Sequence, residues 1–124
     1  MPYNIRIIPG REFIKLDAEG HLDLEMSRKV LSDVIWTCLR SRMARVLIDV
    51  REATSDMTAA HLCKLADVCR EISAQDQDDD RIAILSRPKD EFDRAAFLAA
   101  KAESAGWNVA AFQEFEKAFD WLMS

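Results

Sequence analysis

The sequence predicts an α/β fold in which helices cover a mostly parallel central sheet with an antiparallel edge strand. Apolar residues alternate between short runs typical of strands and longer stretches with helical spacing, in the order β-β-α-β-α-β-α-β-α. The stretch Arg45 to Ile72 places a buried strand, a polar loop and an amphipathic helix in direct succession, which is the repeating unit of such a sheet. A chain of 124 residues supplies one core but not two, so we expect residues 1–124 to form a single domain.

The N-terminal third is expected to form a hairpin and then a helix. Residues 3–8 and 12–18 alternate apolar and polar side chains, and Pro9-Gly10 between them favours a turn. Asp23 then precedes a stretch, residues 26–39, whose apolar side chains recur every three or four positions. Asp23 is therefore the expected cap of the first helix.

The rest of the chain alternates strands and helices. The unbroken apolar run Val46 to Val50 predicts a strand buried on both faces, and residues 51–57 predict a polar loop. Thr58 is the expected N-cap of the second helix. The remaining expected elements are a strand over 82–85, a helix ending before Gly106, a strand over 107–112 and a helix over 114–122.

Charge and composition exclude several classes of function. The formal net charge of −5 argues against a nucleic-acid or anionic-membrane surface, because both require clusters of Lys and Arg. No apolar run approaches the roughly 20 residues that span a bilayer, so no membrane insertion is expected. The N-terminus lacks the apolar region of a secretory signal, and the three cysteines show no C-x-x-C spacing. These features predict a cytoplasmic protein with reduced thiols and no bound metal.

The sequence also argues against an enzyme. Ser55, Asp56 and His61 supply the residue types of a hydrolase triad, but no G-x-S-x-G turn surrounds the serine. No glycine occurs between Gly20 and Gly106, which excludes a glycine-built phosphate cradle on the inner strands. We therefore expect a non-enzymatic domain without a cofactor.

The loops that follow parallel strands meet at one edge of a sheet, so their polar residues are the candidate binding site. Helix N-termini at this edge present unpaired N–H groups, and basic side chains add positive charge, which together favour a small anion or carboxylate. The alternative is a set of ordinary caps and solvated loop residues. The candidate residues are His21, Asp23, Thr54, Ser55, Asp56, Thr58, His61, Arg87 and Lys89.

Three stretches resemble a known family. Gly20 to Leu24 resembles the G-x-L-D opening of STAS domains of the SpoIIAA type, the anti-sigma-factor antagonists. Val46 to Val50 and the helix start after it resemble their next strand and signature loop, and Phe115 to Leu122 resembles the tail common in SpoIIAA-like proteins. The resemblance implies a SpoIIAA-like fold over nearly the whole chain and a regulatory function through protein–protein interaction. Its grouping with CRAL-TRIO domains implies the alternative, a small-molecule or lipid ligand.

The phosphorylation motif of these antagonists is altered in this chain. STAS antagonists carry Asp-Ser-Ser-Gly at the start of the second helix, where the first serine is phosphorylated. Here Met57-Thr58-Ala59-Ala60 takes that place when Asp49 anchors the alignment, and aligning Asp56 instead puts Met57 at the phosphorylated position. Thr58 is the possible phosphosite under the first alignment and is a helix cap under the other interpretation.

Large apolar side chains outside the predicted core faces suggest a protein partner or a homodimer. Trp36, Phe97 and Trp121 lie off the apolar stripes of their helices. The alternative is that they pack beneath loops of the same chain. A closed apolar cavity would favour a small-molecule ligand, and a flat exposed apolar face would favour a protein partner.

Overall fold

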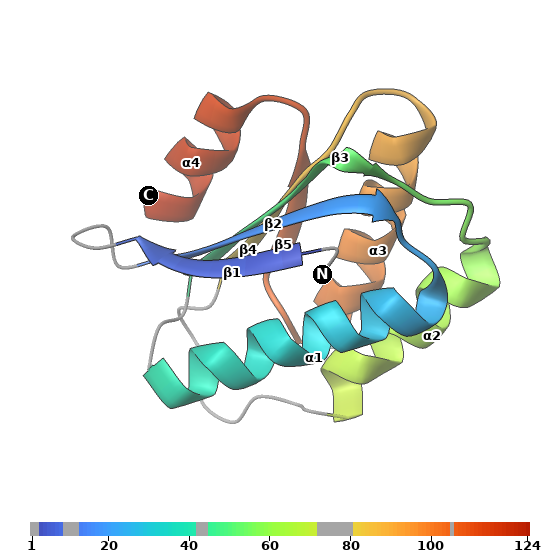
Figure 1. Cartoon of the computed structure of the whole chain (residues 1–124), viewed down its shortest axis with the longest axis horizontal. Helices are drawn as coiled ribbons and strands as arrows, with labels where there is room; N and C mark the ends of the chain where they lie inside the picture. The colour runs from blue at the N-terminus through green and yellow to red at the C-terminus, as the bar shows by residue number, and fades with distance from the viewer. Residues whose placement is uncertain (1–2, 9–12, 42–44, 72–80, 105) are drawn as a thin grey trace.

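The computed structural model of the chain describes residues 3–8, 13–41, 45–71, 81–104 and 106–124. Its nine elements follow the predicted order (Figure 1). They are β1 (Tyr3–Ile8), β2 (Phe13–His21), α1 (Leu24–Ser41), β3 (Arg45–Thr54), α2 (Ala59–Glu71), β4 (Arg81–Leu85), α3 (Asp90–Ser104), β5 (Val109–Phe112) and α4 (Phe115–Met123). The predicted Pro9-Gly10 turn lies outside the described residues.

The five strands form one sheet whose spatial order, β1-β2-β3-β4-β5, is the same as their order in the chain. Strand β1 lies at one edge and pairs antiparallel with β2, whereas β2, β3, β4 and β5 pair in parallel. The strand predicted to be interior, β3, is central. Each parallel strand therefore lies on the same side of the strand that precedes it in the chain, without a reversal of strand order.

This strand order determines which face of the sheet each helix covers. Parallel strands are joined by right-handed crossovers, so three successive crossovers in the same direction place their helices on the same face. Helices α1, α2 and α3 accordingly cover one face with a shared core, and α4 packs on the opposite face against β3, β4 and β5 (Figure 1). Because strand order never reverses among β2 to β5, the sheet has no switch-point crevice of the doubly wound type.

Alternation along the central strand serves both layers. Val46 and Ile48 belong to the core under α1 to α3, and Leu47 belongs to the core under α4. Further along β3 on the α4 side, Asp49 and Arg51 replace apolar residues. Since α4 is only nine residues long, it leaves the carboxyl-terminal half of this face uncovered, which explains the change to charged side chains.

Three predicted boundaries are wrong. The polar loop predicted over 51–57 is shorter, because β3 continues to Thr54 and pairs with a longer β2 that reaches His21. A register shift between Asp17 and Glu19 allows this pairing to resume. The last strand begins at Val109 rather than at Trp107, whose side chain is instead buried in the loop before it.

The aromatic residues outside the predicted core faces differ in exposure. Trp36 is 54% exposed, as its position off the stripe predicts. Phe97 and Trp121 are half-buried, with Lys101 over the first ring and Phe112 beside the second. Phe115, at the start of α4, is 39% exposed and stacks on Phe119. Within the described residues, no helix is both long and apolar enough to span a membrane.

Candidate functional site

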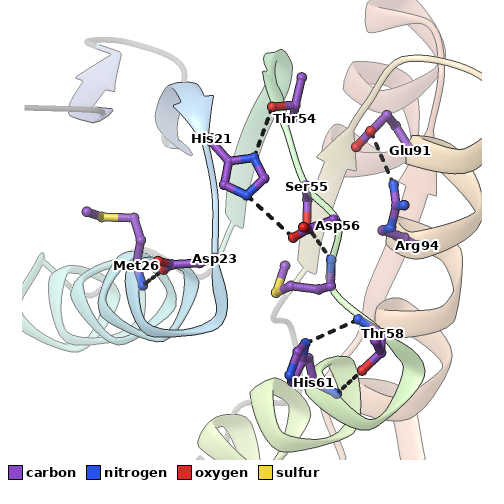
Figure 2. Close-up of polar contacts among 11 residues, drawn as sticks. His21, Asp23, Met26, Thr54, Ser55, Asp56, Thr58, His61, Glu91 and Arg94 are labelled. Atoms are coloured by element: carbon purple, nitrogen blue, oxygen red, sulfur yellow. Dashed lines mark hydrogen bonds and ion pairs between the residues drawn. The ribbon is translucent and has the colours of Figure 1, made fainter.

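The carboxyl ends of β2 and β3 bring part of the predicted site together. The backbone N–H of Leu22 donates to the carbonyl of Thr54, which fixes the two strand ends side by side. His21 bridges them: its Nδ1 lies 3.3 Å from Thr54 Oγ1 and its Nε2 lies 3.4 Å from Asp56 Oδ1 (Figure 2). The Asp56 side chain is 84% exposed, so this cluster is a surface feature of the loop.

Asp23 and Thr58 are helix caps, as predicted. Asp23 Oδ1 accepts a 2.8 Å hydrogen bond from the N–H of Met26 in the first turn of α1. Thr58 Oγ1 accepts from the N–H of His61 at 3.2 Å, and the N–H of Thr58 donates back to His61 Nδ1 at 3.3 Å (Figure 2). This reciprocal pair has the arrangement of a capping box, with His61 in the place usually taken by Glu or Gln.

The three residue types of a hydrolase triad do not contact one another in a relay. Ser55 Oγ accepts a hydrogen bond from the N–H of Met57, and Asp56 pairs with His21 instead of with His61. The Nδ1 of His61 accepts from Thr58. Each member of the set is therefore held by a neighbour that belongs to loop or cap geometry.

Arg87 and Lys89 follow β4 at the same edge. The Arg87 guanidinium donates through Nη2 to the carbonyl of Ala53 at 2.8 Å, which ties the β4–α3 loop to the end of β3. Lys89 has a positive φ of 69° immediately before α3, a conformation that is uncommon for residues other than glycine. Its carbonyl accepts the first helical hydrogen bond, from Asp93.

An apolar pocket of about 120 Å³ lies between the sheet and the layer of α1, α2 and α3. Its walls come from all three helices, from β3, β4 and β5 and from the loop after β3. Among the candidate residues only Thr54 and Ser55 line it, so the cavity adjoins the predicted edge rather than coinciding with it. Apolar lining residues are Leu22, Val30, Leu31, Ile48, Val50, Ala53, Met57, Leu62, Leu65, Ile82, Ile84, Ala95, Leu98, Ala102 and Val109.

Three polar side chains of the helices also line this pocket, and sequence reasoning did not select them as site residues. Ser27 of α1 is 8% exposed, and its hydroxyl has no hydrogen-bond partner within the described part of the chain. Leaving a buried hydroxyl unpaired costs about 1–3 kcal/mol. Glu91 and Arg94 of α3 form a 3.2 Å ion pair opposite the Thr54–Thr58 loop (Figure 2). One of these residues, Ser27, can be recognised from the sequence. It is a polar residue on the apolar stripe of α1, three residues before Val30 and four before Leu31.

Asp49 and Arg51 form an ion pair on the opposite face of the sheet, the face that α4 covers in part. Arg51 donates to both carboxylate oxygens of Asp49, through Nε at 3.1 Å and Nη2 at 2.8 Å. Burial alone raises the pKa of Asp49, but the hydrogen bonds and charge of Arg51 outweigh it, so the pKa lies below its ordinary value. The same hydrogen bond raises the pKa of Arg51. Across the described ranges, no cluster of three or more His, Cys, Asp or Glu side chains is placed to hold a metal ion.

Comparison with known proteins supports the fold alone. No protein-family model matches the chain, and no curated protein matches it. Among solved structures, it is similar to an uncharacterised protein of the DUF3478 family from Shewanella loihica PV-4, described as having a SpoIIAA-like fold. The similarity has a TM-score of 0.57 at 18% sequence identity and covers 97% of this chain and 93% of the other. The predicted SpoIIAA-like fold is thereby confirmed.

Proposed function

We propose that this SpoIIAA-like domain is a non-enzymatic binding protein whose ligand is a small, largely apolar molecule. The observation that carries the proposal is the pocket between the sheet and the three-helix layer. Ligand sites are typically concave and mostly apolar, with a few polar groups that orient the ligand, and this pocket has that composition. The cavity is the feature that favours a small molecule over the protein partner that sequence alone placed first.

The size of the pocket limits the ligand. At about 120 Å³ it is slightly smaller than the engineered cavity of roughly 150 Å³ that admits benzene. A single ring or a short alkyl chain matches this volume, whereas both chains of a phospholipid exceed it. The lipid alternative therefore narrows to short-chain or single-ring compounds.

The pocket can be tested by filling it. Ala95 lines the cavity and is buried, whereas Ala100 on the same helix is exposed and does not line it. We expect Ala95→Leu to abolish binding of benzene or toluene while keeping helix content, because the added carbons occupy the ligand's volume. Ala100→Leu is the matched control and is expected to bind as the wild-type chain does.

Ligand-observed NMR, with thermal unfolding as a fold control, provides the measurement. Equal binding by the Ala95→Leu and Ala100→Leu variants would place the ligand outside this pocket. Failure of the wild-type chain to bind any apolar probe of this size would refute the proposed function.

A regulatory protein partner is the second candidate, and Trp36 supports it. This side chain projects from α1 with 54% of its surface exposed, which is unusual for tryptophan away from an interface. If two copies associate through this helix, Trp36→Glu should convert a dimer into a monomer in sedimentation velocity without changing the circular dichroism spectrum. A wild-type chain that is monomeric at high concentration would exclude the homodimer.

Phosphorylation of Thr58 is part of the same candidate function, regulation through a protein partner. Phosphate at this position would lie at the N-terminus of α2, where the helix dipole favours negative charge. It would also convert the hydroxyl oxygen that accepts from the N–H of His61 into a phosphate ester oxygen. Mass spectrometry of the protein isolated from its own cells tests this directly, and an unmodified Thr58 under all growth conditions would leave it as a cap only.

A further inference from the structure

The pocket has polar groups on two opposite walls. Helix α2 packs against both α1 and α3, so it lies between them, and Ser27 of α1 and Arg94 of α3 face the cavity from different sides. An entirely apolar ligand would leave the Ser27 hydroxyl buried without a partner. The complementary ligand therefore has a hydrogen-bonding atom at each end of an apolar body.

The α3 wall favours a negatively charged group. Arg94 donates one hydrogen bond to Glu91, at 3.2 Å. A guanidinium has five N–H donors in a planar fork that matches a carboxylate, so Arg94 has further donors for a ligand. The two side chains are 28% and 27% exposed, so the pair is accessible from the rim of the pocket. Arg87 adds a second guanidinium on the carbonyl of Ala53, another lining residue.

The charged residues that line the pocket are Arg94 and Glu91. Glu91 is the one carboxylate among the pocket-lining residues. Asp56 is 84% exposed, does not line the pocket and pairs with His21. Within the lining, Arg94 and Glu91 balance each other in charge, and the exposed Arg87 adds positive charge beside the pocket through its contact with Ala53.

We propose that the ligand is a small monocarboxylic acid with a single-ring or short-chain body, bound with its carboxylate on Arg94 and a distal hydrogen-bonding atom on Ser27. This assignment rests on the proposed function, since it names the class of molecule that occupies the same pocket. A charge-assisted, two-point contact with Arg94 is the strongest interaction that the pocket offers. The apolar walls then select for the body of the acid.

The test uses three single-ring probes of similar size: benzoate, benzyl alcohol and 4-hydroxybenzoate. Dissociation constants are measured by calorimetry at pH 7 on the wild-type chain. We expect the acid to bind about tenfold more tightly than the alcohol, which lacks the charge. Arg94→Gln should remove this preference and leave alcohol binding unchanged, whereas Arg28→Gln, which changes an exposed arginine outside the pocket, should preserve it.

The hydroxylated acid tests the distal contact. It should bind more tightly than benzoate to the wild-type chain, and the two acids should bind equally to Ser27→Ala. Equal affinities for acid and alcohol would overturn the assignment to Arg94, and equal affinities of the two acids for the wild-type chain would overturn the assignment to Ser27. Either result leaves the pocket as a binding site, whereas no binding of any probe refutes the proposed function as well.

Discussion

The guanidinium of Arg51 holds the carboxylate of Asp49 two residues away on the same strand, where both side chains project from the α4 face. The Asp49 side chain is 11% exposed and that of Arg51 is 43% exposed. The pair therefore keeps a nearly buried charge hydrogen-bonded at the border between the core under α4 and the uncovered part of the sheet. On β2, Lys15 Nζ and Asp17 Oδ1 lie 2.7 Å apart and form a second ion pair.

This pair predicts a pH dependence of stability. The folded pKa of Asp49 lies below the ordinary value of 3.8, so its contribution is fully present above that pH and is lost as pH falls through the folded pKa. Arg51→Gln should lower the free energy of unfolding by about 1 kcal/mol at pH 7. Urea unfolding from pH 2 to 7 measures this.

The control for this prediction is the double variant Asp49→Asn, Arg51→Gln, which removes both charges. Its stability should vary less over the acid range than that of the wild-type chain. If Arg51→Gln and the wild-type chain lose stability in parallel between pH 5 and 2, the pair makes no contribution.

At the scale of elements, the caps of α1 and α2 were predictable, because capping depends on residues adjacent in sequence. Asp23 and Thr58 precede apolar periodic segments and occupy the expected cap positions. The pocket was not predictable, because its walls combine residues from three helices and three strands. The end of β3 was also missed, since the pairing of its last residues with β2 depends on a register shift that no local pattern encodes.

The cap of α2 gives a second prediction. Thr58→Ala removes the oxygen that accepts from the N–H of His61 and should cost about 1 kcal/mol of stability. Thr58→Asp keeps a capping oxygen and adds charge favoured by the dipole, so it should be nearly neutral. Chemical denaturation of both variants provides the comparison, and equal losses for Ala and Asp would show that capping is not the role of this side chain.

Helix α4 gives a third prediction, because one residue anchors it. Leu122 is fully buried against the core under α4, and Leu122→Ala should cost about 2–5 kcal/mol. Lys117→Ala is the matched control: its side chain is 74% exposed, and it should change stability by less than about 0.5 kcal/mol. Arg81 of β4 holds the same C-terminal end of α4 by donating to the carbonyls of Trp121 and Ser124. Thermal unfolding distinguishes the two variants.

At the scale of the whole molecule, the central strand of the sheet is better protected from solvent than the edge strand β1. Strand β3 is flanked by β2 and β4, and its residues 46–48 are buried between the two cores, whereas β1 has a neighbour on one side within the described sheet. Native-state hydrogen exchange should therefore find the amides of residues 46–50 among the slowest and those of β1 among the fastest of the strands. Faster exchange in β3 than in β1 would contradict this description of the core.

The identity between strand order and chain order has a consequence for synthesis. Each strand pairs only with the strand made just before it and the one made just after it, so no strand has to enter between two partners already in place. The sheet can consequently be extended from one edge as the polypeptide leaves the ribosome, with each crossover helix completed before the next strand arrives. The exception is the face that α4 covers: Leu47 and Leu85 have no apolar cover on that side until the last nine-residue helix emerges. A nascent chain in which α4 has not yet emerged would thus expose an apolar patch, and during that interval chaperone binding and aggregation compete with folding.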